Sequence, residues 1–141
     1  AMTKKKAILA RDYMTSAVAT LTPDMNLLDA VHMLLERRIS GAPVLDDHGN
    51  LVGILTEKDC LRAALNASYY GDLGGLVSDH MQRDVATVAD DTPIFEVTRL
   101  FIDGHFRRYP VVHGHRLVGT ISRRDVLRAL QALSQLEGHQ V

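Results

Sequence analysis

The chain carries one sequence pattern twice, and this repetition constrains its fold more than any other feature. The copies are offset by 67 residues over their first halves and by 66 after a turn that is shorter in the second copy. Matching stretches are residues 12–14 with 79–81, 18–20 with 85–87, 43–44 with 110–111, 51–59 with 117–125, and 61–63 with 127–129. Repetition at a fixed period is typical of units that bury their apolar faces against each other. We therefore expect two similar units packed with pseudo-twofold symmetry, with paired clefts along their seam.

The composition is that of an ordinary globular protein. Of its 141 residues 46% are hydrophobic, and the formal net charge is −1, which argues against a broad nucleic-acid surface. The basic run at residues 4–6 is interpreted as a solvated tail. No apolar run approaches the roughly 20 residues of a membrane span, and no secretory signal is recognisable. We expect a cytoplasmic protein without membrane or nucleic-acid partners.

Each copy reads as strand, helix, strand, strand, helix, which predicts an α/β (α+β) fold. In the first copy we expect strands at 17–21, 42–45 and 51–55 and a closing helix from Glu57 to about Leu65. In the second copy the last two strands are expected at 109–112 and 117–121, and the closing helix from Arg123 to about Leu133. The resulting boundaries are a flexible tail over 1–9, repeats over 10–65 and 77–134, a linker over 66–76, and a carboxy-terminal tail over 135–141.

Apolar residues recur at helical spacing in the first helix of each copy, and we interpret both stripes as core. The first stripe is Leu27, Leu28, Val31, Leu34 and Leu35, and the same pattern in the second copy is Ile94, Phe95, Thr98, Phe101 and Ile102. Cys60, the single cysteine, corresponds to Val126 and is interpreted as a small buried apolar residue. The loops at 46–50 and 113–116 lack the number of ligands that a metal ion needs, so plain hairpin turns are expected.

The densest shared motif is Gly-x-x-[Thr/Ser]-x-x-Asp, at the junction of a strand and a helix. It comprises Gly53, Thr56 and Asp59 in the first copy, and Gly119, Ser122 and Asp125 in the second. A hydroxyl followed three residues later by an acid is typical of a capping box, which would serve only to begin a helix. The same geometry suits a ribonucleotide, because a helix N-terminus favours anions and a carboxylate can accept hydrogen bonds from both ribose hydroxyls. The motif by itself leaves both interpretations open.

Taken in order and twice over, the Asp-x-Met opening, the Pro-Val strand and the Gly-x-x-[Thr/Ser]-x-x-Asp motif resemble the CBS domain pair, or Bateman module. The resemblance covers residues 10–133. It implies a tandem CBS repeat that commonly associates as a homodimer, with clefts between the copies. It also implies that these clefts bind AMP, ADP, ATP or S-adenosylmethionine as regulatory ligands, with no catalytic cofactor.

The family's ligand contacts carry over to both copies. The acid that holds the ribose corresponds to Asp59 and Asp125, and the preceding hydroxyl to Thr56 and Ser122. The resemblance assigns the base to the backbone of Ala17, Val18, Ala19, Asp84, Val85 and Ala86, and the walls of the base and the phosphate approach to Ile39, Ser40, Phe106, Arg107 and Arg108. Each cleft would take its ribose acid from one copy and part of its base pocket from the other.

The copies differ where the resemblance places phosphate. The second copy has Arg107 and Arg108 before its Tyr-Pro-Val strand, whereas the first has Ser40 and Gly41. Arginine binds phosphate with two parallel hydrogen bonds and stays charged. We therefore expect two unequal sites, with the phosphorylated ligand preferring the one that contains Asp125.

These observations favour a sensor module that binds an adenine nucleotide and signals through dimer geometry or an effector protein that the sequence does not identify. The alternative is a dimerisation or protein-interaction module that binds no ligand. Retention of both hydroxyl–acid pairs opposes that alternative. We do not expect an enzyme, because the sequence shows no nucleophile–base pair or metal set and the two acids would lie in separate clefts.

Overall fold

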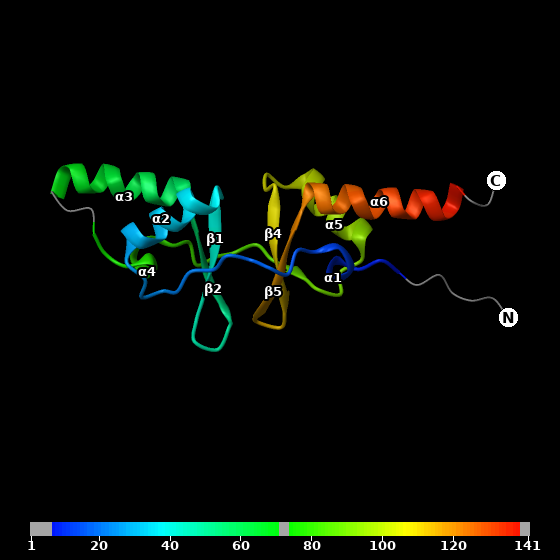
Figure 1. Ribbon diagram of the computed structural model, residues 1–141, viewed down its shortest axis with the longest axis horizontal. Helices are drawn as coiled ribbons and strands as arrows, with labels where there is room; N and C mark the ends of the chain where they lie inside the picture. Colours follow the sequence, from blue (N-terminus) through cyan, green and yellow to red (C-terminus); the bar gives the residue numbers. More distant parts are fainter. Residues whose placement is uncertain (1–6, 71–73, 139–141) are drawn as a thin grey trace. The chain divides into compact units, whose positions relative to one another are not determined.

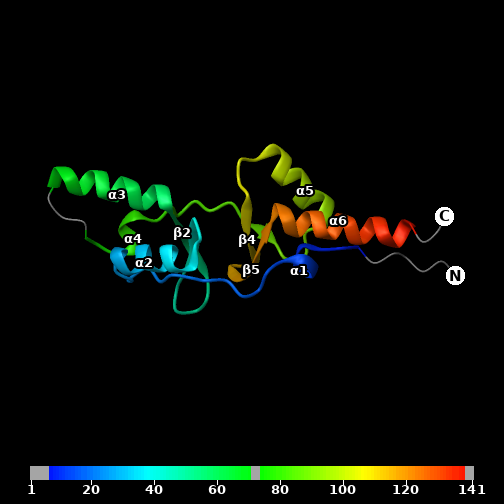
Figure 2. The same ribbon diagram turned by 45° about the horizontal axis from the view of Figure 1, so that its top comes forward.

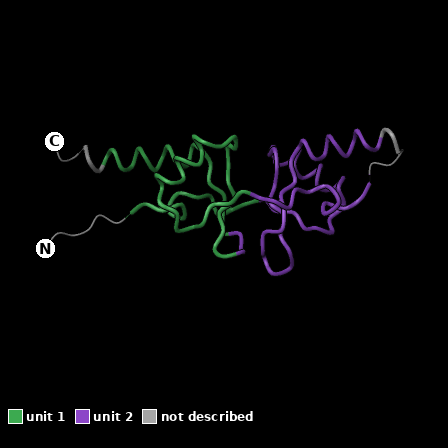
Figure 3. Tube along the Cα trace, turned by 180° about the vertical axis from the view of Figure 1, so that it is seen from behind, with its two compact units in different colours: residues 1–18, 86–114, 118–141 green, residues 19–85, 115–117 purple. Residues whose placement is uncertain are grey.

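The structure is a computed structural model that describes residues 7–70 and 74–138, except for the side chains of 68–70 and 136–138. The chain forms two compact units (Figure 3). Within the described residues, unit 1 comprises 7–18, 86–114 and 118–138, and unit 2 comprises 19–70, 74–85 and 115–117. Residues 10–18, the start of the first repeat, thus belong to the unit built on the rest of the second repeat. Residues 77–85, the start of the second repeat, belong to the unit built on the rest of the first.

Unit 2 is built on an antiparallel hairpin that is joined to two helices. Helix α2 (Leu27–Arg37) leads into strands β1 (Gly41–Leu45) and β2 (Leu51–Thr56), and α3 (Glu57–Tyr70) follows directly. Figures 1 and 2 show α2 and α3 near one end of this hairpin. The side chain of Asn26 begins α2 by accepting a hydrogen bond from the amide of Leu28. Arg38 ends the helix in the left-handed conformation, with a φ of 55°.

Unit 1 repeats this plan with one additional short strand. Strand β3 (Val88–Ala89) pairs in parallel with β4 (Arg108–His113), which pairs with β5 (Arg116–Ser122). Helix α5 (Ile94–Asp103) connects β3 to β4, and α6 (Arg123–Gly138) follows β5 without a break. The buried residues of α5 recur at helical spacing and face the core; they are Ile94, Val97 and Phe101.

A short helix at the start of each repeat packs in the unit that is built on the rest of the other repeat. Helix α1 (Ala10–Tyr13) comes from the start of the chain and contributes Ala10 to the core of unit 1. Helix α4 (Val77–His80) follows the first repeat and contributes Val77 to the core of unit 2. The repeated aspartates of the Asp-x-Met opening begin these helices, because Asp12 accepts from the Leu9 amide and Asp79 from the Leu76 amide, each at 2.9 Å.

The mixed α/β fold predicted from the sequence is confirmed, with corrections to several elements. The strand expected at 17–21 is absent except for one bridge between Leu21 and Val44, because these residues connect unit 1 to unit 2. Helix α3 continues to Tyr70, into the segment expected as a linker, and α6 continues to Gly138, into the expected tail. Ile8, within the expected amino-terminal tail, packs against the core of unit 1.

The apolar stripes are only partly core. Leu27 and Leu34 are buried, but Leu35 is 72% exposed, and its counterpart Ile102 is 76% exposed. Leu28 and Phe95, again equivalent positions, are also exposed. A stripe that occupies more than one side of a helix cannot bury every member against a single neighbouring sheet. The interpretation of the whole stripe as core was therefore wrong.

Candidate functional site

The capping box is present in both copies of the repeated motif. In unit 2 the Asp59 carboxylate accepts from the Thr56 amide at 2.8 Å, and the Asp59 amide donates to the Thr56 hydroxyl at 3.4 Å. In unit 1 the corresponding distances between Ser122 and Asp125 are 2.8 and 3.2 Å. Each pair begins the helix that follows, α3 or α6, as the structural interpretation of the motif predicts.

The motif glycines allow the Asp-x-Met segments to approach the strands. A Cβ atom on Gly53 would lie 2.6 Å from the Met81 sulfur, and one on Gly119 would lie 2.7 Å from the Thr15 carbonyl oxygen. Each segment then forms an antiparallel bridge with its strand, between Gln82 and Ile54 in unit 2 and between Thr15 and Thr120 in unit 1. The bridges place residues 82 and 15 beside the two motif acids.

Asp59 is buried and accepts hydrogen bonds at both oxygens. Oδ2 accepts from the amide and the hydroxyl of Thr56, at 2.8 and 2.9 Å. Oδ1 accepts from the Arg62 guanidinium at 3.0 Å. The side-chain amide of Gln82 donates to Oδ1 at 3.1 Å and to Oδ2 at 3.3 Å. Asp59 is 4% exposed.

Asp125 has fewer partners. Its Oδ2 accepts from the Ser122 amide, and its Oδ1 accepts from the Arg128 guanidinium. Among the residues that the structure describes, no side chain of the 7–18 segment donates to Asp125, although Thr15 occupies the position equivalent to Gln82. Asp125 is 7% exposed, so the two acids differ in their partners rather than in their burial.

The residues at or just before the starts of β1 and β4 lie close to the start of the closing helix of the same unit, α3 or α6. The Ser40 carbonyl accepts from the Glu57 amide at 2.9 Å, and the Arg107 carbonyl accepts from the Arg123 amide at 3.2 Å. The structure therefore brings Ser40 close to the Thr56–Asp59 box and Arg107 close to the Ser122–Asp125 box. The side chain of Arg108 donates to the Thr120 hydroxyl at 3.4 Å.

The charge at these two helix starts differs strongly. Helix α6 begins with two arginines, Arg123 and Arg124, and the exposed Arg107 and Arg108 lie beside them. Helix α3 begins with Glu57 and Lys58, and Ser40 stands in place of Arg107. Cations at a helix N-terminus oppose the helix dipole, which favours negative charge there. The start of α6 therefore favours an added anion more than the start of α3 does.

Each of the two backbone segments expected to line the base contains a boundary between the two units. Ala17 and Val18 belong to unit 1 together with Phe106, Ser122 and Asp125, whereas Ala19 belongs to unit 2. In the equivalent segment, Asp84 and Val85 belong to unit 2 together with Ile39, Thr56 and Asp59, and Ala86 belongs to unit 1. Within the described parts of the chain, residues 17–19 and 84–86 form no backbone hydrogen bonds. The assignment of these segments to the base stays a prediction.

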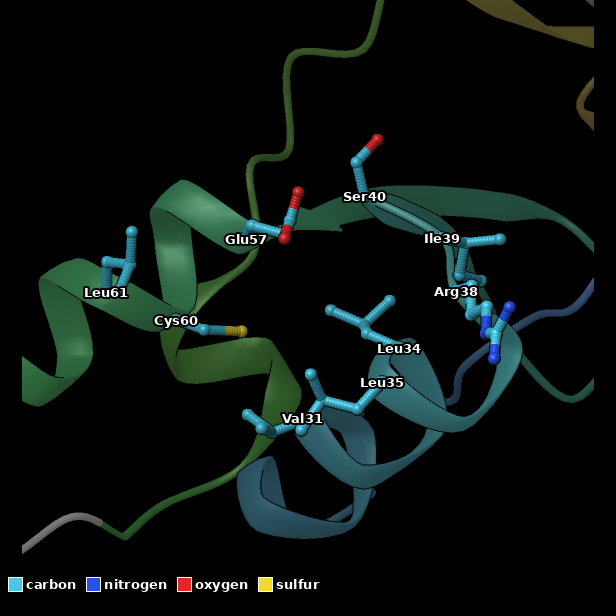
Figure 4. A pocket seen from close by; sticks show the side chains of 9 residues that line it. All are labelled: Val31, Leu34, Leu35, Arg38, Ile39, Ser40, Glu57, Cys60 and Leu61. Atoms are coloured by element: carbon cyan, nitrogen blue, oxygen red, sulfur yellow. The ribbon is translucent and has the colours of Figure 1, made fainter.

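A separate groove of about 500 Å³ lies between α2 and α3 in unit 2. Its lining includes Ile39 and Ser40 but not Thr56 or Asp59; the residues are Val31, Leu34, Leu35, Arg38, Ile39, Ser40, Glu57, Cys60 and Leu61. Figure 4 shows Leu34 and the Cys60 sulfur pointing into this groove. The sequence pattern did not predict this groove, because the whole apolar stripe, including the exposed half that lines the groove, was interpreted as core.

Cys60 is half-buried at the groove rather than fully buried as expected. Burial raises the pKa of its thiol, and the nearby carboxylates of Asp59 and Glu57 raise this pKa further. The thiol is therefore protonated at neutral pH.

The two hairpin loops are turns, as expected. Asp46 accepts from the amides of His48 and Asn50, both at 2.9 Å, and Gly49 has a φ of 81°. The backbone hydrogen bond from Asn50 is the largest cause that lowers the pKa of Asp46. Among the described residues, no three His, Cys, Asp or Glu side chains gather as metal ligands would. None of the described helices is both long and apolar enough to cross a membrane.

Two strand–helix units, each with a buried carboxylate at the start of its closing helix, define a duplicated module of the kind that the sequence pattern predicts. Residues 10–66 and 77–132 match the family model of the CBS domain. The chain therefore belongs to the CBS domain family, and the resemblance given above is confirmed.

Several solved structures share this fold. CBSX2 of Arabidopsis thaliana, in complex with AMP, is 29% identical with a TM-score of 0.76, over 89% of this chain and 98% of that one. The CBS domain pair of protein MJ0100, in complex with 5′-methylthioadenosine and S-adenosyl-L-methionine, is 25% identical with a TM-score of 0.68, over 90% and 98%. Among sequences, protein MJ1225 of Methanocaldococcus jannaschii is 32% identical over 120 residues, which are 85% of this chain but 42% of MJ1225.

Proposed function

We propose that the protein is a regulatory module that binds an adenine nucleotide in unit 1 and reports its presence to an effector protein. The observation that carries the proposal is the start of α6, where a buried carboxylate with few partners lies beside a group of arginines. Asp125 would accept hydrogen bonds from the ribose hydroxyls, and the arginines would hold the phosphate. Related CBS domain pairs that bind AMP or S-adenosyl-L-methionine support this ligand class.

The base would lie against the unpaired backbone of Ala17 and Val18, with Phe106 as one wall. Phe106 is exposed at 54%, and its ring packs edge-on against Tyr109 at a centroid distance of 5.5 Å. An exposed aromatic ring of fixed orientation is suited to stacking on a planar base. AMP, ADP and ATP share this adenosine and differ in their number of phosphates, so the arginines would decide among them.

The first test compares AMP with adenosine. We expect the protein to bind AMP in isothermal titration calorimetry, and Arg108→Ala to lower AMP affinity by about tenfold or more, because it removes a charged hydrogen-bond donor to phosphate. Adenosine affinity should stay unchanged, since adenosine carries no phosphate. Arg99→Ala removes another exposed arginine of unit 1, on α5, and is the matched control. Absence of AMP binding by the unaltered protein would favour the alternative, an interaction module that binds no ligand.

We further propose that the protein forms a homodimer through its exposed apolar helix faces. Leu28, Leu35 and Leu61 are exposed on α2 and α3, and the equivalent Phe95, Ile102 and Leu127 are exposed on α5 and α6. Apolar residues repeated at equivalent exposed positions favour a symmetric partner that presents the same surface. The groove of Figure 4 opens on the α2–α3 face and would receive side chains of the second copy.

The double variant Leu35→Glu and Ile102→Glu is expected to be a monomer in sedimentation velocity experiments at concentrations where the unaltered protein is a dimer. Each change places a charge in an apolar contact, where it would lose its hydration. The matched control is Glu36→Lys, which reverses an exposed charge on the same helix and removes the contact of Glu36 with His32, and it should leave the dimer intact. A double variant that still sediments as a dimer would show that this face is not the interface.

A further inference from the structure

We infer that Gln82 closes the ribose site of unit 2, so that Asp59 does not accept a nucleotide in the resting protein. This inference rests on the proposed function, because it takes the two motif acids as potential ribose acceptors. It adds a residue outside the motif that decides which of the two acids can serve.

The two carboxylates differ in the hydrogen-bonding capacity that they have left. An ionised carboxylate offers about four acceptor positions. Asp59 already receives donors from Thr56, Arg62 and Gln82, which together use both oxygens fully. Asp125 receives one donor at each oxygen, from Ser122 and Arg128. A ribose can therefore bind to Asp125 without displacing a protein group, whereas at Asp59 it would have to displace one.

The contact that Gln82 makes with Asp59 has the form expected of a ribose. Its amide group donates to both oxygens of Asp59, at 3.1 and 3.3 Å. Two vicinal ribose hydroxyls would make the same pair of contacts, so the Gln82 amide takes the place that the resemblance assigns to the ligand. The Thr56 hydroxyl also donates to the Asp59 carboxylate, at 2.9 Å, whereas Ser122 donates to the Asp125 carboxylate through its amide and its hydroxyl accepts from the Asp125 amide.

Gln82 is held in position by its backbone. Its amide donates to the Ile54 carbonyl at 2.8 Å, and its carbonyl accepts from the Ile54 amide at 2.9 Å. The same two bonds join Thr15 and Thr120 in unit 1, at 2.8 and 2.9 Å. The two bridges are equivalent, so the difference at this position lies in the side chain and not in the backbone. Glutamine reaches the carboxylate, and the shorter threonine leaves it open.

The test exchanges the two side chains. Asp125→Ala removes the ribose acid of unit 1, so that AMP binding to this variant reports on Asp59. Adding Gln82→Thr is expected to raise its AMP affinity by about tenfold or more in isothermal titration calorimetry, because the ligand no longer competes with charged hydrogen bonds. The reciprocal Thr15→Gln, in the otherwise unaltered protein, is expected to weaken AMP binding at Asp125 by a similar factor. Circular dichroism establishes that each variant is folded.

The outcomes separate this inference from the proposed function. The unaltered protein could bind AMP while Gln82→Thr leaves AMP affinity at Asp59 unchanged and Thr15→Gln leaves it unchanged at Asp125. That result would show that Gln82 does not close the site, and it would overturn the inference while the proposed function stands. If neither the unaltered protein nor Gln82→Thr binds AMP, the proposed function fails and the inference fails with it. Gain of AMP affinity at Asp59 together with loss at Asp125 would support both.

Discussion

Replacing Asp125 by asparagine is expected to lower AMP affinity by about 10- to 100-fold, since hydrogen bonds to charged groups contribute about 1.5–3 kcal/mol. Asparagine has nearly the same shape and keeps one side-chain oxygen, which can still accept from the Ser122 amide and preserve the start of α6. It loses the charge and the second oxygen, and its amide nitrogen cannot accept from a hydroxyl. The variant therefore separates ligand binding from the capping role of the same side chain.

The measurement is isothermal titration calorimetry with AMP, supported by the thermal midpoint with and without ligand. Asp91→Asn is the matched control, because it makes the same chemical change at an exposed position of unit 1 and should leave AMP affinity unaltered. Full AMP affinity in a folded Asp125→Asn variant would contradict the proposed role of Asp125.

Gly119→Ala is expected to destabilise unit 1 by about 2–4 kcal/mol, which combines overpacking with the weakening of backbone hydrogen bonds. The added Cβ would lie 2.7 Å from the Thr15 carbonyl oxygen and 2.8 Å from the Met14 sulfur. The methionine can move, but the carbonyl oxygen is backbone and is held in the bridge to Thr120. The 7–18 segment would have to shift away from β5, which would also disturb the packing of Ala10 in the core.

The measurement is the free energy of unfolding in urea, monitored by circular dichroism. The control is Gly114→Asn, in the hairpin between β4 and β5, where an added Cβ would meet nothing within 4 Å. Gly114 has a φ of 64°, a conformation that asparagine tolerates better than most residues, so a change below about 1 kcal/mol is expected. An unchanged urea midpoint for Gly119→Ala would show that the segment can move at little cost.

The sequence was most informative about interactions between residues that are close together in the chain. The spacing of Thr56 and Asp59, and of Ser122 and Asp125, predicts the capping boxes because all their atoms lie within one helical turn. The strands of the two hairpins were also placed to within a few residues, since alternation and turn residues act over short distances. The strand expected at 17–21 was wrong, because its β propensity does not outweigh the need to connect two units.

The exposed half of each helix stripe shows a different limit. Periodicity identifies the apolar side of α2 but does not say how wide a surface the sheet can cover. Leu34 turns inward and Leu35 turns outward, although both are leucines in adjacent positions. The groove beside α3 follows from that division, and no single sequence signal marks it.

The sequence alone determined the duplication, the α/β class and the family, because each depends on residues that recur in register. For the same reason it predicted the two motif carboxylates as candidate ribose acceptors. It also predicted unequal sites, from Arg107 and Arg108 against Ser40 and Gly41. Only the tertiary structure placed the Gln82 side chain against Asp59, because the two residues are far apart in the chain. They meet where the residues after α4 form a bridge with β2, between Gln82 and Ile54. A hydrogen bond between distant residues depends on the path of the backbone, and that path is set by the packing of whole units.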